Sequence, residues 1–251
     1  DAGVEVEVTT AASDAAPLGT YVVRDAPPPL LHELATEYRL RFTGAGLPPK
    51  AKPLHDVRLA VGGGPDTQFV LRELGFDFDV VGTGAALGDY EVFVNNSTGF
   101  TATKVKTFVK QGGGYVGLGY AGTASNLGRL LPLRFGATAL SGANAIVRAS
   151  FESQSLVGAG YSADDWGFVS RPVWYTDLGK GVTVEARYGD QDDWYVCGYW
   201  AKRDAARGQA VVVSGSRGGG EIVFIGFAPT FRAYPEHHFR LVANSIWEVV
   251  D

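Results

Sequence analysis

The sequence predicts an α/β fold, in which a doubly wound, mostly parallel sheet gains an antiparallel β extension in the second half of the chain. Three observations support it. Between residues 57 and 118, short apolar runs alternate with amphipathic segments of about ten residues, the pattern of parallel strands joined by right-handed helical crossovers. The run Tyr90–Val94 is apolar apart from Glu91, as in a strand covered on both faces. After residue 142, β-type segments follow one another with little helix between them.

Residues 1–50 are expected to form an N-terminal segment or linker. Two short alternating stretches, Val4–Val8 and Thr20–Val23, indicate edge strands, and Leu30–Leu40 has one apolar stripe, as a helix would. Prolines at positions 48, 49 and 53 mark a hinge. We therefore place a boundary near residue 50 and assign residues 51–251 to the α/β domain.

The elements of that domain follow from apolar runs and turn residues. Its first half is expected to contain strands at 57–61, 76–81, 90–94 and 115–118, with helices at 66–74 and 101–111. Its second half is expected to contain strands at 143–151, 182–188, 194–200, 210–214 and 221–227. A last helix is predicted from Pro235 to about Val250, because proline is favoured in a first turn. Cys197, in an aromatic strand, is predicted to be a buried thiol.

Composition narrows the class of protein. The chain has 251 residues, 45% hydrophobic and 20% charged, as in a globular protein, and no apolar run is long enough to span a membrane. A net charge of -5 argues against nucleic acid as a partner. No acid occurs between Val92 and Phe151, whereas six lysines and arginines do. A mixed solvated surface is the favoured interpretation of that window, and an anion-binding face is the alternative. The absence of methionine and the start at Asp1 suggest a piece of a larger or processed protein.

A glycine motif, Gly117–Gly122, matches G-x-G-x-x-G after a strand and before a helix. In dinucleotide-binding proteins, these glycines let a pyrophosphate approach the helix N-terminus. Here the motif follows the fourth predicted strand, and the ribose-binding acid expected about twenty residues later is missing. We therefore expect no cofactor.

The same segment has a second interpretation. Residues 112–122 resemble the nucleophile elbow of class I glutamine-amidotransferase-like proteins, which have a flavodoxin-like fold and display a cysteine on a strained strand-to-helix turn. The resemblance implies that Gly119, or Tyr120 after a shift of one residue, stands at the cysteine position. Neither is such a nucleophile, so the elbow is degenerate and no catalytic residue is expected.

The histidines of the sequence are not expected to take the place of the missing cysteine nucleophile. In Glu236-His237-His238, adjacent histidines on a helix would point about 100° apart, and we expect a partly exposed pair near the helix N-terminus. His32 and His55 have no His-x-x-x-His or His-x-x-Glu spacing, so no metal site is expected.

Several segments together resemble one family: residues 69–76, 112–122, 181–188, 194–200 and 227–233. They resemble the C-terminal amidotransferase-like domain behind the catalytic domain of large secreted bacterial zinc carboxypeptidases, over roughly residues 55–251. The resemblance implies a non-catalytic accessory or ligand-binding domain of a secreted, extracellular hydrolase. It also implies an adjacent catalytic domain as partner, and a peptide or cell-wall ligand. The peptidase's own His-x-x-Glu motif is missing, so peptidase activity is not implied for this chain.

Any ligand is expected in the crevice at the carboxyl ends of the parallel strands. The candidate binding residues are Gly63, Gly64, Asn96, Ser97, Gly119, Tyr120, Thr123, Arg232 and His237. Arg232 could clamp a carboxylate or fix its own loop. Two alternatives stay open. One is a small-molecule hydrolase or amidotransferase-like enzyme that uses the crevice without a cysteine, through Tyr120 and His237 or His238. The other is a purely structural domain.

Overall fold

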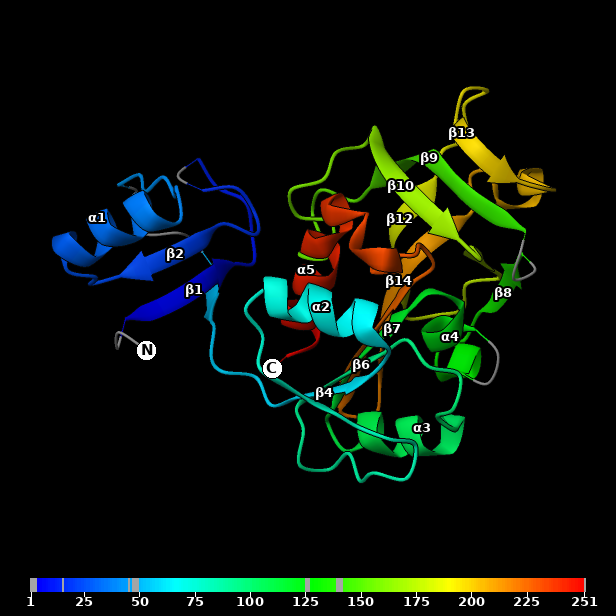
Figure 1. Cartoon of the computed structure of the whole chain (residues 1–251), viewed down its shortest axis with the longest axis horizontal. Helices are drawn as coiled ribbons and strands as arrows, with labels where there is room; N and C mark the ends of the chain where they lie inside the picture. The colour runs from blue at the N-terminus through cyan, green and yellow to red at the C-terminus, as the bar shows by residue number, and fades with distance from the viewer. Residues whose placement is uncertain are drawn as a thin grey trace.

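The structure is a computed structural model that describes residues 4–14, 16–44, 46, 50–124, 127–138 and 142–250. Within these residues the strands form two sheets, one three-stranded and one twelve-stranded (Figure 1). We call residues 4–54 the N-terminal module and residues 55–250 the α/β domain. The smaller sheet lies in the module and the larger sheet in the domain.

The N-terminal module is a small antiparallel sheet with one helix. Its strands run in the order β2-β1-β3, and helix α1 follows β2. The bounds are Glu5–Thr9 for β1, Tyr21–Arg24 for β2, Pro28–Glu37 for α1 and Ala51–Pro53 for β3. The two strands and the helix predicted here are present, but the predicted apolar stripe of α1 buries no residue. Strand β3 pairs with β1, so the smaller sheet extends just past residue 50.

The first half of the α/β domain is the predicted parallel sheet. Its strands lie in the order β5-β4-β6-β7, and every neighbouring pair is parallel. The bounds are Leu59–Gly62 for β4, Phe78–Val80 for β5, Val92–Asn95 for β6 and Gly114–Leu118 for β7. Every residue of β4, β6 and β7 is buried. This explains why these strands appear in the sequence as apolar runs without alternation.

The second half is the predicted antiparallel extension. Strand β15 is parallel to β7, and β14, β12, β9 and β10 then continue the sheet with antiparallel pairings. The bounds are Arg134–Ala137 for β8, Ala143–Phe151 for β9, Asp165–Ser170 for β10, Val173–Thr176 for β11, Val182–Tyr188 for β12, Tyr195–Trp200 for β13, Ala210–Arg217 for β14 and Gly220–Ile225 for β15. Strands β8, β10 and β11 were not expected from the sequence. The predicted fold class is confirmed.

Helices cover both faces of the large sheet (Figure 1). Residues of α2 and α5 pack into one hydrophobic cluster, whereas α3 contributes to a second cluster on the other face. The two clusters meet β7 through alternate residues, Val116 and Leu118 in the first and Tyr115 in the second. The helix bounds are Pro65–Glu73 for α2, Ala102–Lys110 for α3, Gly119–Thr123 for α4 and Phe239–Val249 for α5.

The predicted start of the last helix was wrong. Residues 236–238 form a separate 3₁₀ turn, and α5 begins only at Phe239. Pro235 has φ -85° and ψ 62°, which is not helical, and the two left-handed residues Arg232 and Ala233 turn the chain before it. Proline at this point therefore belongs to the approach to the helix and not to its first turn.

The thiol of Cys197 is exposed, which contradicts the prediction of a buried cysteine. A register shift between Tyr195 and Cys197 breaks the pairing of β13 with β9. Such a bulge interrupts the alternation of inward and outward side chains. The neighbouring Trp194 and Trp200 are buried, so the aromatic run does contribute to the core.

A small joint connects the module to the domain. Val8 packs against Leu156 and Ala159 in a third hydrophobic cluster. Lys52, on β3, donates from Nζ to the carbonyl oxygens of Trp247 and Val250, the latter at 2.9 Å. Trp247 lies in the last turn of α5 and Val250 follows the helix directly, where backbone acceptors have no partner within the helix. Among the described residues, no helix has the length and apolarity needed to cross a bilayer.

Candidate functional site

The candidate residues follow strands at the point where the strand order reverses. From β4 the chain first adds β5 on one side and then β6 on the other, so β4 and β6 flank the switch point of the sheet. Their carboxyl ends lead into residues 62–64 and 95–98, and β7 leads directly into α4. In open α/β sheets, loops at this edge splay apart and form the usual ligand site.

The elbow between β7 and α4 is a sharp turn. Leu118 is still extended, with φ -109° and ψ 129°, whereas Gly119 has φ 55°, in the left-handed region. In this turn, Gly119 and not Tyr120 has the left-handed backbone. An ideal Cβ on Gly119 would lie 3.6 Å from the carbonyl oxygen of Phe227 and 3.8 Å from Oδ1 of Asn96, which is ordinary contact distance. The position has room for a side chain.

The elbow is held by close backbone packing. An ideal Cβ on Gly122 would lie 2.0 Å from the carbonyl oxygen of Asn95, and one on Gly117 would lie 2.4 Å from that of Gly122. The hydroxyl of Tyr115 donates to the Gly122 carbonyl at 2.7 Å, and it accepts from Nδ2 of Asn95 at 3.0 Å. Gly117 and Gly122 therefore serve the contact between helix and strands, and the glycine pattern needs no nucleotide to explain it.

A hydroxyl and amide cluster lies beside the elbow. Thr67 and Thr230 are both buried, and their hydroxyl oxygens lie 3.3 Å apart. Asn96 directs Nδ2 toward both hydroxyls, at 3.5 Å and 3.4 Å, and its Oδ1 faces the Cβ position of Gly119. These long contacts leave the carboxamide of Asn96 available for a stronger partner.

Most of the predicted candidates do lie at this edge. Gly63 and Gly64 lead into α2, and Asp66 of that helix accepts a hydrogen bond from the backbone N–H of Arg232 at 2.8 Å. The Arg232 side chain is exposed and lies over its own neighbour, the ring of Phe231. The turn that holds Asn96 includes Ser97, whose N–H donates to Oδ1 of Asn95 at 3.0 Å.

Thr123 lies within the elbow helix and serves its geometry. Its hydroxyl donates to the carbonyl oxygen of Gly119 at 2.7 Å, and its side chain is buried. The sequence did not single out Thr67 or Thr230. Thr230 had one signal, a small polar residue within an otherwise apolar segment, whereas Thr67 lies between Asp66 and Gln68 and had none.

The histidine pair has its aromatic contacts in the hydrophobic cluster that contains α5. His237 is exposed, and its Nε2 lies 2.6 Å from Oδ1 of Asp165. His238, predicted to be partly exposed, is in fact buried, and its ring lies 5.0 Å from that of Phe227. Burial lowers the pKa of His238 to about 4, so it is neutral near pH 7.

Tyr120 and these histidines belong to opposite faces of the sheet. Tyr120 packs on the cluster that contains α3, whereas the aromatic partners of His237 and His238, Tyr161 and Phe227, lie in the cluster that contains α5. The structure therefore does not bring together the tyrosine and histidines considered as an alternative catalytic set. Within the described ranges, no three His, Cys, Asp or Glu side chains are placed to hold a metal ion.

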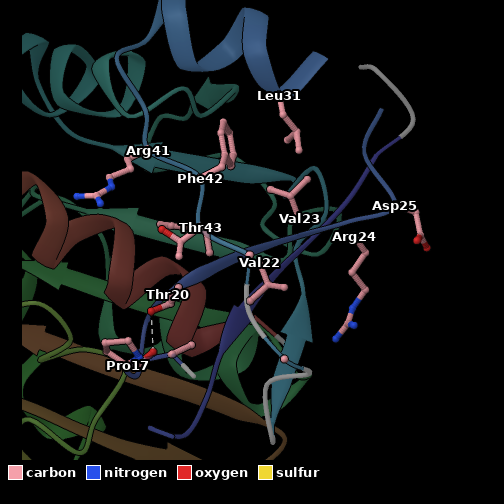
Figure 2. Close-up of a pocket in the computed structure, with 14 residues that line it drawn as sticks. Pro17, Thr20, Val22, Val23, Arg24, Asp25, Leu31, Arg41, Phe42 and Thr43 are labelled. Atoms are coloured by element: carbon pink, nitrogen blue, oxygen red, sulfur yellow. Dashed lines mark hydrogen bonds between the residues drawn. The ribbon is translucent and has the colours of Figure 1, made fainter. Parts of the chain in front are cut away.

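A hollow within the described residues lies apart from the candidate residues. It has a volume of about 980 Å³ and lies in the N-terminal module, between β2, α1 and residues 41–44. Figure 2 shows the side chains of Val23, Leu31 and Phe42 around it. None of the candidate residues predicted from the sequence lines this hollow.

Comparison with known proteins gives structural matches alone. No protein-family model matches the sequence, and a search of the curated proteins finds no match. A protein described as part of a GMP synthase from Thermoplasma acidophilum is similar over 77% of this chain and 94% of its own, with a TM-score of 0.55 and 15% identity. A glutamine amidotransferase from Thermotoga maritima is similar over 77% of this chain and 97% of its own, with a TM-score of 0.52 and 12% identity.

A third similar structure is a much longer chain. The β-galactosidase from Bacillus circulans sp. alkalophilus is similar over 77% of this chain but only 31% of its own, with a TM-score of 0.52 and 16% identity. Identities this low show the fold alone. The chain thus has the class I glutamine-amidotransferase-like fold, as the elbow predicted, and these comparisons give no support to the finer resemblance to a carboxypeptidase domain.

Proposed function

We propose that this chain is a cysteine-free, glutamine-amidotransferase-like domain that binds a small amide-bearing molecule in the elbow crevice without forming a covalent intermediate. The observation that carries the proposal is Gly119. It has the left-handed backbone of the nucleophile position and open space for a side chain, yet it has no reactive atom. The proposed site thus has the backbone turn of an elbow and lacks the group that would attack a bound amide.

Asn96 determines the kind of ligand. Its carboxamide has both a donor and an acceptor and faces the space above Gly119. An amide group of the ligand can pair with the Asn96 carboxamide through two hydrogen bonds, because each group has one N–H to donate and one carbonyl oxygen to accept. The fold similarity to glutamine amidotransferases favours the same chemical class, with L-glutamine as the first probe.

The wider setting is also a proposal. A role beside the catalytic domain of a longer chain is supported by the β-galactosidase, in which this fold is about a third of the chain. Secretion, and a peptide or cell-wall ligand, rest on the sequence resemblance alone, and the similar structures favour an amidotransferase-like role over that of a carboxypeptidase accessory domain.

The test is to measure L-glutamine and acetamide binding by titration calorimetry, and ammonia release in the same samples. We expect binding without turnover in the unmodified chain. Gly119→Asn should abolish binding, because asparagine tolerates a left-handed backbone and its side chain would fill the crevice. The matched control is Gly75→Asn, which changes an exposed glycine of φ 77° far from the crevice in sequence. Ammonia release that Gly119→Asn abolishes would refute a non-catalytic role, and binding unchanged by Gly119→Asn would refute the site.

A further inference from the structure

The turn between β10 and β11 contains an arginine that has no acidic partner among the described residues. Arg171 lies in the two-residue turn between β10 and β11. The flanking residues attach this turn to the carboxyl end of β15. Val173 donates its N–H to the carbonyl of Gly226 at 3.2 Å, and Phe168 accepts from the N–H of Ala228 at 3.2 Å. The residue between them, Phe227, faces Gly119 across the elbow. The turn therefore lies at the same edge of the sheet as the elbow.

The guanidinium of Arg171 stacks on the residue that follows Gly119. Its Cζ lies 3.5 Å from the centre of the Tyr120 ring. Stacking of this kind holds an arginine in place while leaving the edge of its planar fork free for hydrogen bonds. Tyr120 is itself partly buried against the cluster of α3, so the aromatic support is fixed by packing.

This guanidinium makes no ion pair or hydrogen bond with the residues that the structure describes. Its Nε is buried without an acceptor. Arg148 also has a buried Nε without a hydrogen bond, but its guanidinium is ion-paired, 3.0 Å from Asp164 and 3.2 Å from Asp193, and Arg24 is paired with Glu7. A half-buried cation without a partner is costly, and such groups in proteins are normally paired. The segment of the elbow adds no compensating charge, since no acid occurs from Val92 to Phe151.

The backbone at Arg171 is also unusual. Its φ is 54°, in the left-handed region, which is unfavourable for a residue with a Cβ. Glycine at this position would have no backbone strain, yet the chain has an arginine here, whose side chain lies over the ring of Tyr120.

We propose that Arg171, supported by Tyr120, is the carboxylate-binding residue of the elbow crevice, so that the ligand is a small molecule with both an amide and a carboxylate. This rests on the proposed function for the amide part alone. The planar fork of Arg171 suits a carboxylate through two parallel hydrogen bonds. Asn96 and Arg171 then hold opposite ends of one ligand on the two sides of Gly119.

The experiment compares four probes by titration calorimetry: L-glutamine, L-glutamine amide, glutarate and inorganic phosphate. We expect L-glutamine to bind about 10- to 100-fold more weakly to Arg171→Gln than to the unmodified chain, the effect of losing a charge-assisted hydrogen bond. Affinity for L-glutamine amide, which has no carboxylate, should change by less than about twofold. Arg171→Lys should fall between the two, because it keeps the charge and loses the fork. Arg187→Gln, at an exposed arginine of β12, is the matched control and should change nothing.

The two proposals can fail separately. L-Glutamine bound equally well by Arg171→Gln would overturn the role of Arg171 and leave the amide site intact. Glutarate bound through Arg171 without any binding of L-glutamine amide would support the carboxylate site and overturn the amide proposal. Phosphate bound more tightly than glutarate, with the same dependence on Arg171, would overturn the assignment to a carboxylate. No binding of any probe would overturn both. Circular dichroism and the melting temperature of each variant would show that the fold is kept.

Discussion

The N-terminal module and the α/β domain bury their apolar side chains to different extents. Every residue of β4, β6 and β7 is buried, whereas β2 and α1 bury none. A hollow of about 980 Å³ also lies in the module. The difference follows from the layers. The large sheet has helices on both faces, while three short strands with a single ten-residue helix cannot enclose a core. The stability of the chain therefore resides in the α/β domain, and the module depends on the joint at Lys52.

The largest loss of unfolding free energy is expected from a substitution in the core of the α/β domain. Phe93 is fully buried and lies 4.7 Å from Phe100 and 5.7 Å from Tyr115, between ring centres. Replacing it with alanine should lower the free energy of unfolding by about 3–5 kcal/mol, through lost transfer energy and the cavity left behind. Urea denaturation followed by circular dichroism measures this. A loss below about 1 kcal/mol would show that this cluster is not the main core.

Acid should weaken the domain and not the module. The pKa of His238 is lowered from 6.5 to about 4 by burial. Between these values the unfolded chain binds more protons than the folded chain, so the contribution of His238 is complete above pH 6.5 and is lost as the pH falls to about 4. It amounts to about 3 kcal/mol, from the size of the shift.

Substitution can isolate that contribution. His238→Gln keeps a neutral donor for the carbonyl of Trp166, the partner of Nε2 at 3.3 Å, and should flatten the change in unfolding free energy between pH 4 and pH 6.5. The control is His32→Gln, at an exposed residue of α1, which should not change how the unfolding free energy depends on pH. An unchanged profile in His238→Gln would contradict the assignment.

An intermediate effect is expected at the joint. Lys52→Met removes the donor that binds the last carbonyls of α5 and should cost about 1–2 kcal/mol of module stability, as loss of charged hydrogen bonds does. Hydrogen exchange at the amides of β1 should then speed up about tenfold, while exchange in β6 should not change. Lys50→Met, two residues earlier and exposed, is the control. Equal acceleration in both sheets would mean that module and domain unfold as one unit.

The smallest loss of unfolding free energy is expected from a substitution at the hollow of the N-terminal module. Phe42 lines it and is 38% exposed, so Phe42→Ala should cost less than about 1 kcal/mol, in contrast to the same substitution at Phe93. The two variants, measured side by side in urea, give the comparison its simplest form. A cost at Phe42 close to that at Phe93 would show that a partner or a second copy closes the hollow in solution.

The sequence revealed the parts of the fold that depend on local patterns. Buried parallel strands produced apolar runs, and Gly119 was found because a turn into a helix has its own signature. Strands β10 and β11 were not predicted from the sequence. Gly167 interrupts the apolar alternation of β10, and the turn between the two strands has Arg171-Pro172 in place of a glycine. Contacts such as Thr67 with Thr230 join residues 163 positions apart, and no local pattern predicts them.

The left-handed backbone of Gly119 has a consequence for how such a chain can change. Any residue with a Cβ is strained at this φ, by roughly 1 kcal/mol, and glycine is not. Exchange of a nucleophile for glycine at an elbow is therefore favourable for folding, and the reverse exchange is not. A chain that has made the exchange is more stable and inert, and it regains chemistry only together with a stabilising change elsewhere. At an elbow of this geometry, stability therefore favours the change from a nucleophile to glycine over the reverse change.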